Sequence, residues 1–249
     1  MFTDSHCHLY SEFYDNIDEV ILSAKNNGVY RYISCADSLN SCKEVHENSY
    51  KYDNYYYSLG IHPENYQESY LDFEKIFYYC LPNKKLVAIG EIGLDYHYDN
   101  FDKKRQIELF SKQLALAEKE SLPVIVHSRD ATMDTINILK NYNLKGVIHC
   151  FSGSLETAKE YLKMGFYIGI GGVLTFKNSK LKDIIKDIPL DRIILETDSP
   201  FLAPEPFRGQ INEPKNIKEI AEYLAKVKDI SIDEVANQTE TNIHDLFNI

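Results

Sequence analysis

The feature that most constrains this chain is a regular alternation of short apolar stretches with amphipathic ones. Eight stretches rich in Ile, Val, Leu and Tyr are typical of strands buried on both faces. They are FTDSH (2–6), YRYISCA (30–36), YYYSLGI (55–61), LVAIGEI (86–92), PVIVH (123–127), GVIHC (146–150), FYIGIGG (166–172) and RIILETD (192–198). Helical patterns separate them, and further helical stretches over 215–228 and 231–247 close the chain. Such alternation indicates repeated strand–helix units and therefore an α/β protein.

Eight such units predict a single domain, residues 1–249, folded as a (β/α)8 barrel of the TIM type. The alternative is an open doubly wound sheet, which the same alternation permits. No dinucleotide-binding fingerprint favours that sheet, because GIGG (169–172) ends a strand and does not open a helix. We find no linker or internal repeat that divides the chain.

Charge and composition exclude several classes of protein. A formal net charge of −11 argues against a broad basic face for nucleic acid, so attraction of a phosphate must be local. No apolar run is long enough to span a membrane, and no signal-peptide pattern opens the chain. Five cysteines without CxxC spacing indicate reduced thiols, so we expect a cytoplasmic protein. Nothing in the sequence indicates an obligate protein partner.

Unusual polar residues gather at the carboxyl ends of the predicted strands. In a strand, residues two apart share a face, so Asp4, His6 and His8 are expected to line up. Strand ends of a barrel converge on one mouth, where active sites are built. Four imidazoles and two carboxylates are expected to meet there; they are His6, His8, Glu91, His127, His149 and Asp198.

Imidazole nitrogen and carboxylate oxygen together suit divalent ions such as Zn²⁺, Mn²⁺, Co²⁺ or Fe²⁺. Six donors exceed the three that one catalytic zinc ion takes from the protein. They divide over two ions about 4 Å apart, with one carboxylate as a bridge. Such a pair activates a water and stabilises an anionic transition state, which indicates hydrolysis of a phosphate ester or of another ester or amide.

Six motifs in chain order carry a resemblance to a known family. They are DSHCHL (4–9), GIHP (60–63), GEIGLDYH (90–97), VHSR (126–129), HCFSGS (149–154) and ETDSPFLAP (196–204). Together they resemble the TatD family of metal-dependent deoxyribonucleases, which belongs with the amidohydrolase-like barrels. The similarity runs from residue 4 to about residue 248 and includes RGQINEP (208–214).

The resemblance implies two divalent metal ions (Zn, Mg, Mn or similar) and a role for each ligand. The first ion would be bound by His6, His8 and Asp198. Glu91 would bridge to the second ion, which His127 and His149 complete. Asp198 is also the candidate general base.

Strand alternation places Asp4 and Glu196 on the inner face, one layer below the ligands. There they either orient ligand histidines or act as inner-layer packing partners.

Three further residues are candidates for substrate contact. Arg129 either binds a phosphate oxygen or pairs with Asp130. Arg208, in a loop flanked by Pro and Gly, is either a phosphate clamp or an ordinary surface arginine. His62 either contacts substrate or steadies its loop, and Asp95 is expected to shape the loop after Glu91.

The sequence therefore predicts a dinuclear-metal hydrolase that cleaves phosphodiester bonds in DNA. Two alternatives stay open: a dinuclear esterase or amidohydrolase, such as one acting on an aminoacyl ester or a lactone, and a non-catalytic nucleic-acid-binding protein with a structural metal. An intact set of six ligands argues against the second, because a structural site needs only closed fourfold coordination.

Overall fold

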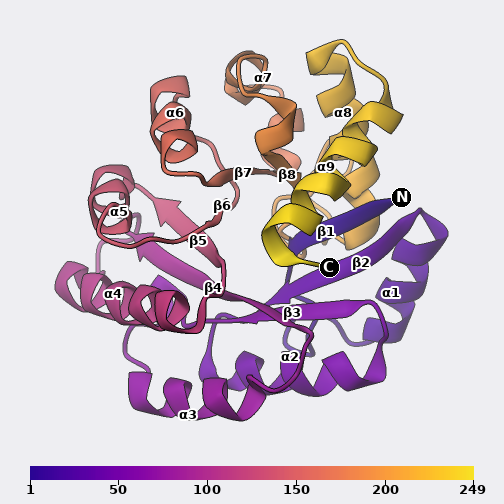
Figure 1. Ribbon diagram of the computed structural model, residues 1–249. Coiled ribbons are helices and arrows are strands. Elements are labelled where there is room, and N and C mark those ends of the chain that lie inside the picture. Colours follow the sequence, from indigo (N-terminus) through magenta and orange to yellow (C-terminus); the bar gives the residue numbers. More distant parts are fainter.

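The computed structural model describes residues 1–249 and contains eight parallel strands arranged around a common axis (Figure 1). The strands are β1 (Phe2–Cys7), β2 (Val29–Cys35), β3 (Tyr55–Leu59), β4 (Leu86–Asp95), β5 (Val124–Arg129), β6 (Gly146–Ile148), β7 (Tyr167–Ile170) and β8 (Ile193–Leu195). Each strand pairs with the next in chain order, from β1 to β8. The predicted α/β barrel is thus confirmed.

Helices follow the strands and surround the barrel (Figure 1). They are α1 (Ile17–Asn26), α2 (Leu39–Lys51), α3 (Tyr70–Cys80), α4 (Lys103–Glu120), α5 (Thr132–Leu139), α6 (Leu155–Lys163), α7 (Leu181–Ile185), α8 (Ile217–Lys228) and α9 (Ile232–Phe247), with short 3₁₀ turns η1 (Pro63–Asn65), η2 (Gly172–Thr175), η3 (Leu190–Arg192) and η4 (Pro214–Asn216). Asn, Ser or Asp side chains cap α1, α2, α3, α4, α6 and α9 by accepting from the first turn. None of the helices has the length and apolar character needed to cross a bilayer.

The barrel closes where β8 meets β1, just past the carboxyl ends of both strands. A parallel bridge joins Cys7 to Ser199. The N–H of Asp198 donates to the carbonyl of His6 at 2.8 Å, and the N–H of His8 donates to the carbonyl of Ser199 at 2.8 Å. Closure therefore brings three of the predicted metal ligands to one seam.

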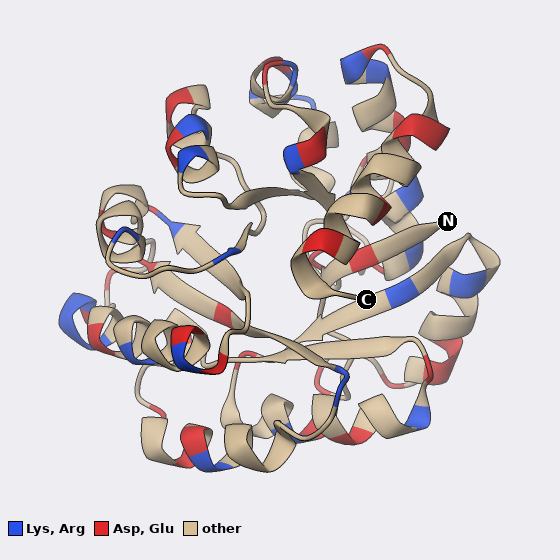
Figure 2. Cartoon of the chain, viewed as in Figure 1, with Lys and Arg blue, Asp and Glu red and all other residues tan.

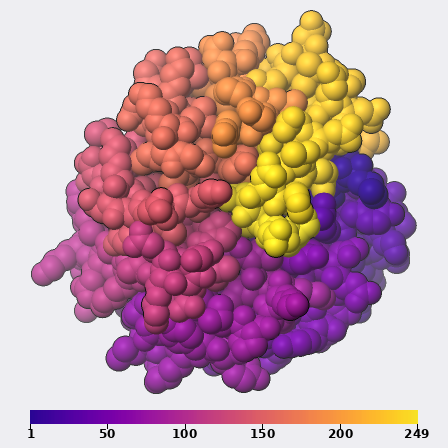
Figure 3. Space-filling view, viewed as in Figure 1, coloured from indigo at the N-terminus to yellow at the C-terminus, as the bar shows by residue number.

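Helix α9 covers the opposite end of the barrel, the one that faces the viewer in Figure 1. Its residues Ile243, Leu246 and Phe247 pack against apolar side chains that fill the barrel interior. Glu240 on the same helix accepts hydrogen bonds from Thr3 at the start of β1 and from the Arg31 guanidinium on β2. Figure 3 shows this C-terminal segment against the N-terminal residues. Helix α9 thus covers the end of the barrel opposite the carboxyl ends of the strands.

The bounds of every strand differ from the predicted ranges, and the differences at β4, β6 and β8 bear on the polar residues. Strands β6 and β8 have three residues each, shorter than expected, because the chain turns soon after them. Cys150 (φ +46°) and Asp198 (φ +56°) occupy the left-handed region, which ends the extended conformation. Strand β4 is longer than expected, because its pairing with β5 continues as far as Asp95.

Candidate metal centre

Glu91 occupies the middle of a polar cluster in the barrel mouth. A register break in β4 between Ile89 and Ile92 brackets Glu91, so it projects from within the strand and not from its end. Its Oε1 lies 2.9 Å from Nδ1 of His127 and 2.7 Å from Nε2 of His149.

The other carboxylate oxygen of Glu91 faces a different pair of imidazoles. Oε2 lies 3.3 Å from Nε2 of His6 and 3.8 Å from Nε2 of His8. Each oxygen of the Glu91 carboxylate therefore faces a different pair of imidazoles. A carboxylate that bridges two ions needs this arrangement.

Asp198 completes the half of the cluster that contains β1. Its Oδ1 lies 3.6 Å from Nε2 of His6 and 3.5 Å from Nε2 of His8, and these two nitrogens are 3.3 Å apart. The left-handed backbone at Asp198 directs this carboxylate into the mouth, and Asp adopts that conformation more readily than most residues. The side chain of Asp198 is 12% exposed, more than those of His6 and His8, so this carboxylate is the member of this half nearest to solvent.

Burial and opposite charges compete in setting the protonation states of the cluster. Burial lowers the pKa of His8, but its hydrogen bond with Asp198 and the charge of Glu91 outweigh this and raise the pKa to about 9. Burial opposes ionisation of Glu91, yet surrounding imidazoles, His149 first, hold its pKa well below the usual range. Burial together with the charge of His149 lowers the pKa of His6 to about 4. Ionised carboxylates and a neutral His6 are the states that metal binding requires, whereas His8 must release its proton when an ion binds.

The donor set fits divalent metal ions. Three groups of side chains bring donor atoms within 4.8 Å of one another; they are His6 with His8 and Asp198, His62 with Glu91 and His127, and His6 with His149 and Glu196. The Nδ1 atoms of His6 and His149 are buried without a hydrogen-bond partner. Imidazole nitrogens mixed with carboxylate oxygens favour ions such as Zn²⁺, Mn²⁺ or Fe²⁺.

Neighbouring groups fix the orientation of two of the imidazoles. Nδ1 of His8 lies 2.9 Å from the carbonyl oxygen of Cys35, which leaves its Nε2 facing the cluster. Nε2 of His127 lies 3.0 Å from Oδ2 of Asp95, which leaves its Nδ1 facing Glu91. Such partners set the tautomer and ring angle of ligating histidines.

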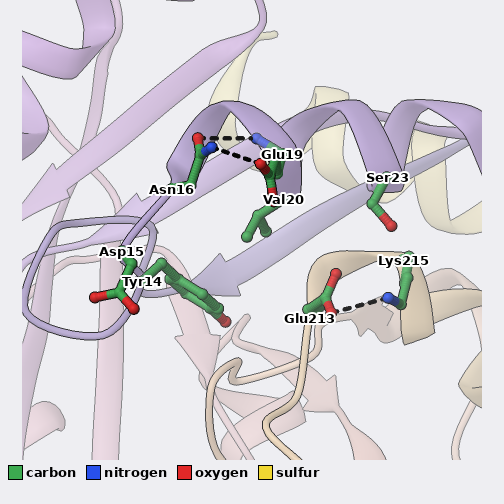
Figure 4. Close-up of a pocket in the computed structure, with 8 residues that line it drawn as sticks. All are labelled: Tyr14, Asp15, Asn16, Glu19, Val20, Ser23, Glu213 and Lys215. Atoms are coloured by element: carbon green, nitrogen blue, oxygen red, sulfur yellow. Dashed lines mark hydrogen bonds and ion pairs between the residues drawn. The ribbon is translucent and has the colours of Figure 1, made fainter.

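Two hollows on the outer surface contain none of these donors. Figure 4 shows one of about 380 Å³, lined by the start of α1 and by the η4 region, where Lys215 donates to Glu213 at 2.8 Å. Another, of about 270 Å³, lies near the opposite end of the barrel around Val29 and Asn54. The candidate centre is therefore identified by its converging donor atoms and not by cavity volume.

A comparison with known families matches this chain to the model described as TatD related DNase over residues 3–248. The chain belongs to the TatD family. An uncharacterized metal-dependent hydrolase of Bacillus subtilis, YabD, is 42% identical over 254 residues, which cover all of this chain and all of YabD. The family resemblance of the six sequence motifs is thus confirmed, and the TatD-family chain is a member of the metal-dependent hydrolases.

Solved structures agree with this assignment. The crystal structure of YjjV, a TatD homologue from Escherichia coli, superimposes with a TM-score of 0.94 at 32% identity, covering 100% of this chain and 98% of that one. A TatD-family hydrolase from Entamoeba histolytica gives a TM-score of 0.88 at 30% identity, covering 99% of this chain and 97% of that one. The TatD fold therefore extends over the whole chain.

All six predicted metal ligands of this TatD-family chain lie in one cluster; they are His6, His8, Glu91, His127, His149 and Asp198. Their division between two ions stays a prediction. The side chain of His62 also lies 3.5 Å from Oε1 of Glu91, and its ring packs against that of His127 with centroids 4.5 Å apart. His62 is thus a neighbour of the cluster, and its Nδ1 also accepts the N–H of Glu64, which steadies the loop.

Asp4 and Glu196 are both fully buried below the cluster but make different contacts. Asp4 accepts hydrogen bonds from the N–H of Thr197 at 2.9 Å and from the N–H of His6 at 3.3 Å, so it fastens the backbone of the seam and contacts no imidazole. Glu196 accepts the N–H of Cys150, and its Oε1 lies 3.7 Å from Nδ1 of His149. Only Glu196 faces a ligand imidazole.

The two candidate arginines are exposed and make no ion pair. The Arg129 guanidinium lies 5.3 Å from the ring of Tyr98, and its charge helps to hold the pKa of Asp95 low. It does not pair with Asp130, whose carboxylate instead lies 2.9 Å from Nδ1 of His97. Arg208 lies over the ring of Phe176 at 3.8 Å. Their role in substrate binding stays a prediction.

Asp95 is the neighbour of the cluster whose main contact the sequence did not predict. It shapes the loop as expected, accepting the N–H of His97 at 2.9 Å, but it also holds His127. The available signal was its position four residues after Glu91, on the same face of an extended β4.

Proposed function

We propose that this protein is a nuclease that hydrolyses phosphodiester bonds in DNA with two divalent ions held by the cluster. The observation that carries the proposal is Glu91, whose two oxygens face the pairs His127–His149 and His6–His8. The family description TatD related DNase supports DNA as the substrate.

Divalent ions bound here would supply a water of lowered pKa and positive charge for phosphate oxygens. Two side chains near the proposed ions would have different roles in the reaction. Burial opposes ionisation of Asp198, but its hydrogen bond with His8 and the nearby imidazoles lower its pKa, so the carboxylate is available as a proton acceptor. The exposed Arg129 guanidinium, which lies over the ring of Tyr98, would pair with a phosphate oxygen.

The substrate proposal is tested with an end-labelled oligonucleotide incubated with Mg²⁺, Mn²⁺ or Zn²⁺, with and without a chelator. We expect cleavage that the chelator abolishes and that Glu91→Gln does not show. Cleavage of no nucleic acid with any of these ions, together with turnover of aminoacyl esters or lactones, would instead establish an esterase. Binding of DNA without any hydrolysis would establish a non-catalytic protein.

The cytoplasm is the proposed compartment. The five cysteines are all free thiols, the form that a reducing compartment maintains.

A further inference from the structure

Two phenylalanine rings stand beside the half of the cluster that contains β1. Phe13 lies in the loop after β1 and Phe201 in the loop after β8, and their ring centroids are 5.3 Å apart. Both rings pack against the imidazole of His8, with centroid distances of 5.9 and 5.8 Å. Because Nε2 of His8 faces Glu91 and Asp198, these rings form an aromatic wall next to the proposed reacting centre.

Phe201 is held rigidly in this position. Its N–H donates to the carbonyl of Asp198 at 2.8 Å, and its own carbonyl accepts from Nδ2 of Asn212 at 2.7 Å. Asn212 is fully buried and also donates to the carbonyl of Thr197 at 2.9 Å. Despite these backbone hydrogen bonds, Phe201 is 47% exposed, so an apolar residue faces solvent beside the proposed general base.

The net charge of this protein does not favour binding of a polyanion such as DNA. The chain has 27 Lys and Arg against 38 Asp and Glu, and Figure 2 shows both signs interspersed along the outer helices. Long-range attraction and counterion release therefore contribute little. Stacking on an aromatic ring is uncharged and is available to every base.

We propose that Phe201, backed by Phe13, stacks a nucleobase of the nucleotide next to the scissile phosphate. The inference rests on the proposed nuclease function and deepens it, because it assigns recognition of the base to a site that contacts no phosphate. Because the Phe201 ring packs against His8, whose Nε2 lies 3.5 Å from Oδ1 of Asp198, a base stacked on Phe201 would bring its phosphate toward this half of the cluster.

The test compares an oligonucleotide that has all its bases with matched oligonucleotides that lack one base, either on the 5′ or on the 3′ side of the cleaved linkage. For the wild type, kcat/KM is expected to be at least about fivefold higher when the base is present, the lower limit of base–aromatic stacking. Phe201→Ala is expected to bring this ratio close to one, and Phe201→Trp to preserve it. Tyr79→Ala, at a 77% exposed residue on α3, is the control and is expected to keep the wild-type ratio.

A second measurement does not depend on turnover. Fluorescence of 2-aminopurine, placed next to a slowly cleaved phosphorothioate linkage, is expected to be quenched by the wild type and by Tyr79→Ala but not by Phe201→Ala. A wild type that cleaves DNA with equal kcat/KM for all of these substrates would overturn the inference and leave the nuclease function standing. So would a folded Phe201→Ala variant that keeps both the ratio and the quenching. Turnover of carboxyl esters without any cleavage of DNA would overturn both.

Discussion

Oδ2 of Asp95 lies 3.0 Å from Nε2 of His127, on the side of the ring opposite Glu91. The hydrogen bond raises the pKa of His127, which reaches about 9 despite burial that lowers it. A carboxylate behind a ligating imidazole fixes its tautomer and increases its basicity. We therefore expect Asp95 to position His127 in the half of the cluster formed by His127 and His149.

We expect Asp95→Asn to weaken binding of a metal ion by roughly 10- to 100-fold, because the imidazole loses its anionic partner. The Asn side chain retains an oxygen that can accept the N–H of His97, so the loop is preserved. Affinity is measured by titrating chelator-treated protein with Mn²⁺ or Zn²⁺. Asp130→Asn, at an exposed carboxylate in the next loop, is the control. If Asp95→Asn binds the metal ion as tightly as the wild type, the carboxylate of Asp95 does not contribute to metal binding by His127.

The backbone at Asp198 makes its replacement by asparagine informative. Asn tolerates a φ of +56° as Asp does, so the fold is expected to survive. Loss of the proton acceptor is expected to lower kcat by about 10²- to 10⁴-fold. The rate is measured on an oligonucleotide at saturating metal, and circular dichroism verifies the fold. A folded variant with the wild-type kcat would mean that another group accepts the proton.

Gly169 on β7 leaves no room for a side chain beneath the cluster. A Cβ atom there would lie 2.6 Å from Oε2 of Glu196 and 2.9 Å from Cα of His149. We expect Gly169→Ala to lower the free energy of unfolding by about 1–3 kcal/mol, as overpacking does. Gly171→Ala is the control, because its Cβ would meet no atom closer than 3.5 Å. Urea unfolding of the metal-free variants measures the difference, and equal stabilities would contradict the steric argument.

Apolar periodicity was sufficient to predict the barrel, because buried parallel strands are nearly continuous in Ile, Val and Leu. The convergence of six polar side chains also followed from topology, since strand ends of a barrel share one mouth. Apolar periodicity does not predict the local backbone conformations that direct these side chains toward one another. The register break around Glu91 and the left-handed turn at Asp198 depend on pairing with strands distant in sequence.

Contacts between loops were the least predictable part of the site. Phe13 and Phe201 are 188 positions apart, yet closure of the barrel places both on His8. Asp95 was assigned to a loop because the apolar run of β4 ends earlier than its pairing with β5. In both cases tertiary neighbours, and not local propensity, decide what the residue contacts.

His46 provides a pH-dependent contribution to stability far from the cluster. Its ring packs edge-to-face against those of Tyr50 and Tyr79, and its Nδ1 lies 2.8 Å from the hydroxyl of Tyr57. Burial lowers the pKa of His46 from 6.5. The folded state therefore binds fewer protons than the unfolded state, so this stability is present above pH 6.5 and is lost as the pH falls toward the folded pKa.

We expect the unfolding free energy of the metal-free wild type to fall more steeply below pH 6.5 than that of His46→Gln. One proton limits the difference in slope to about 1.4 kcal/mol per pH unit. Above pH 7 the two curves are expected to run parallel, which serves as the internal control. Parallel curves throughout the acidic range would show that His46 does not contribute.

Glu91 tests whether the cluster holds two ions or one. Elemental analysis of the wild type is expected to find up to two divalent ions per chain. Glu91→Gln replaces an anionic oxygen by a neutral amide nitrogen, so both imidazole pairs lose the charge between them, and we expect it to retain fewer than one ion. His8→Asn and His149→Asn each alter one side of Glu91 and are expected to lose one ion each. Two ions in Glu91→Gln would exclude the bridge. If the wild type holds a single ion that either histidine variant abolishes, then His8 and His149 bind the same ion.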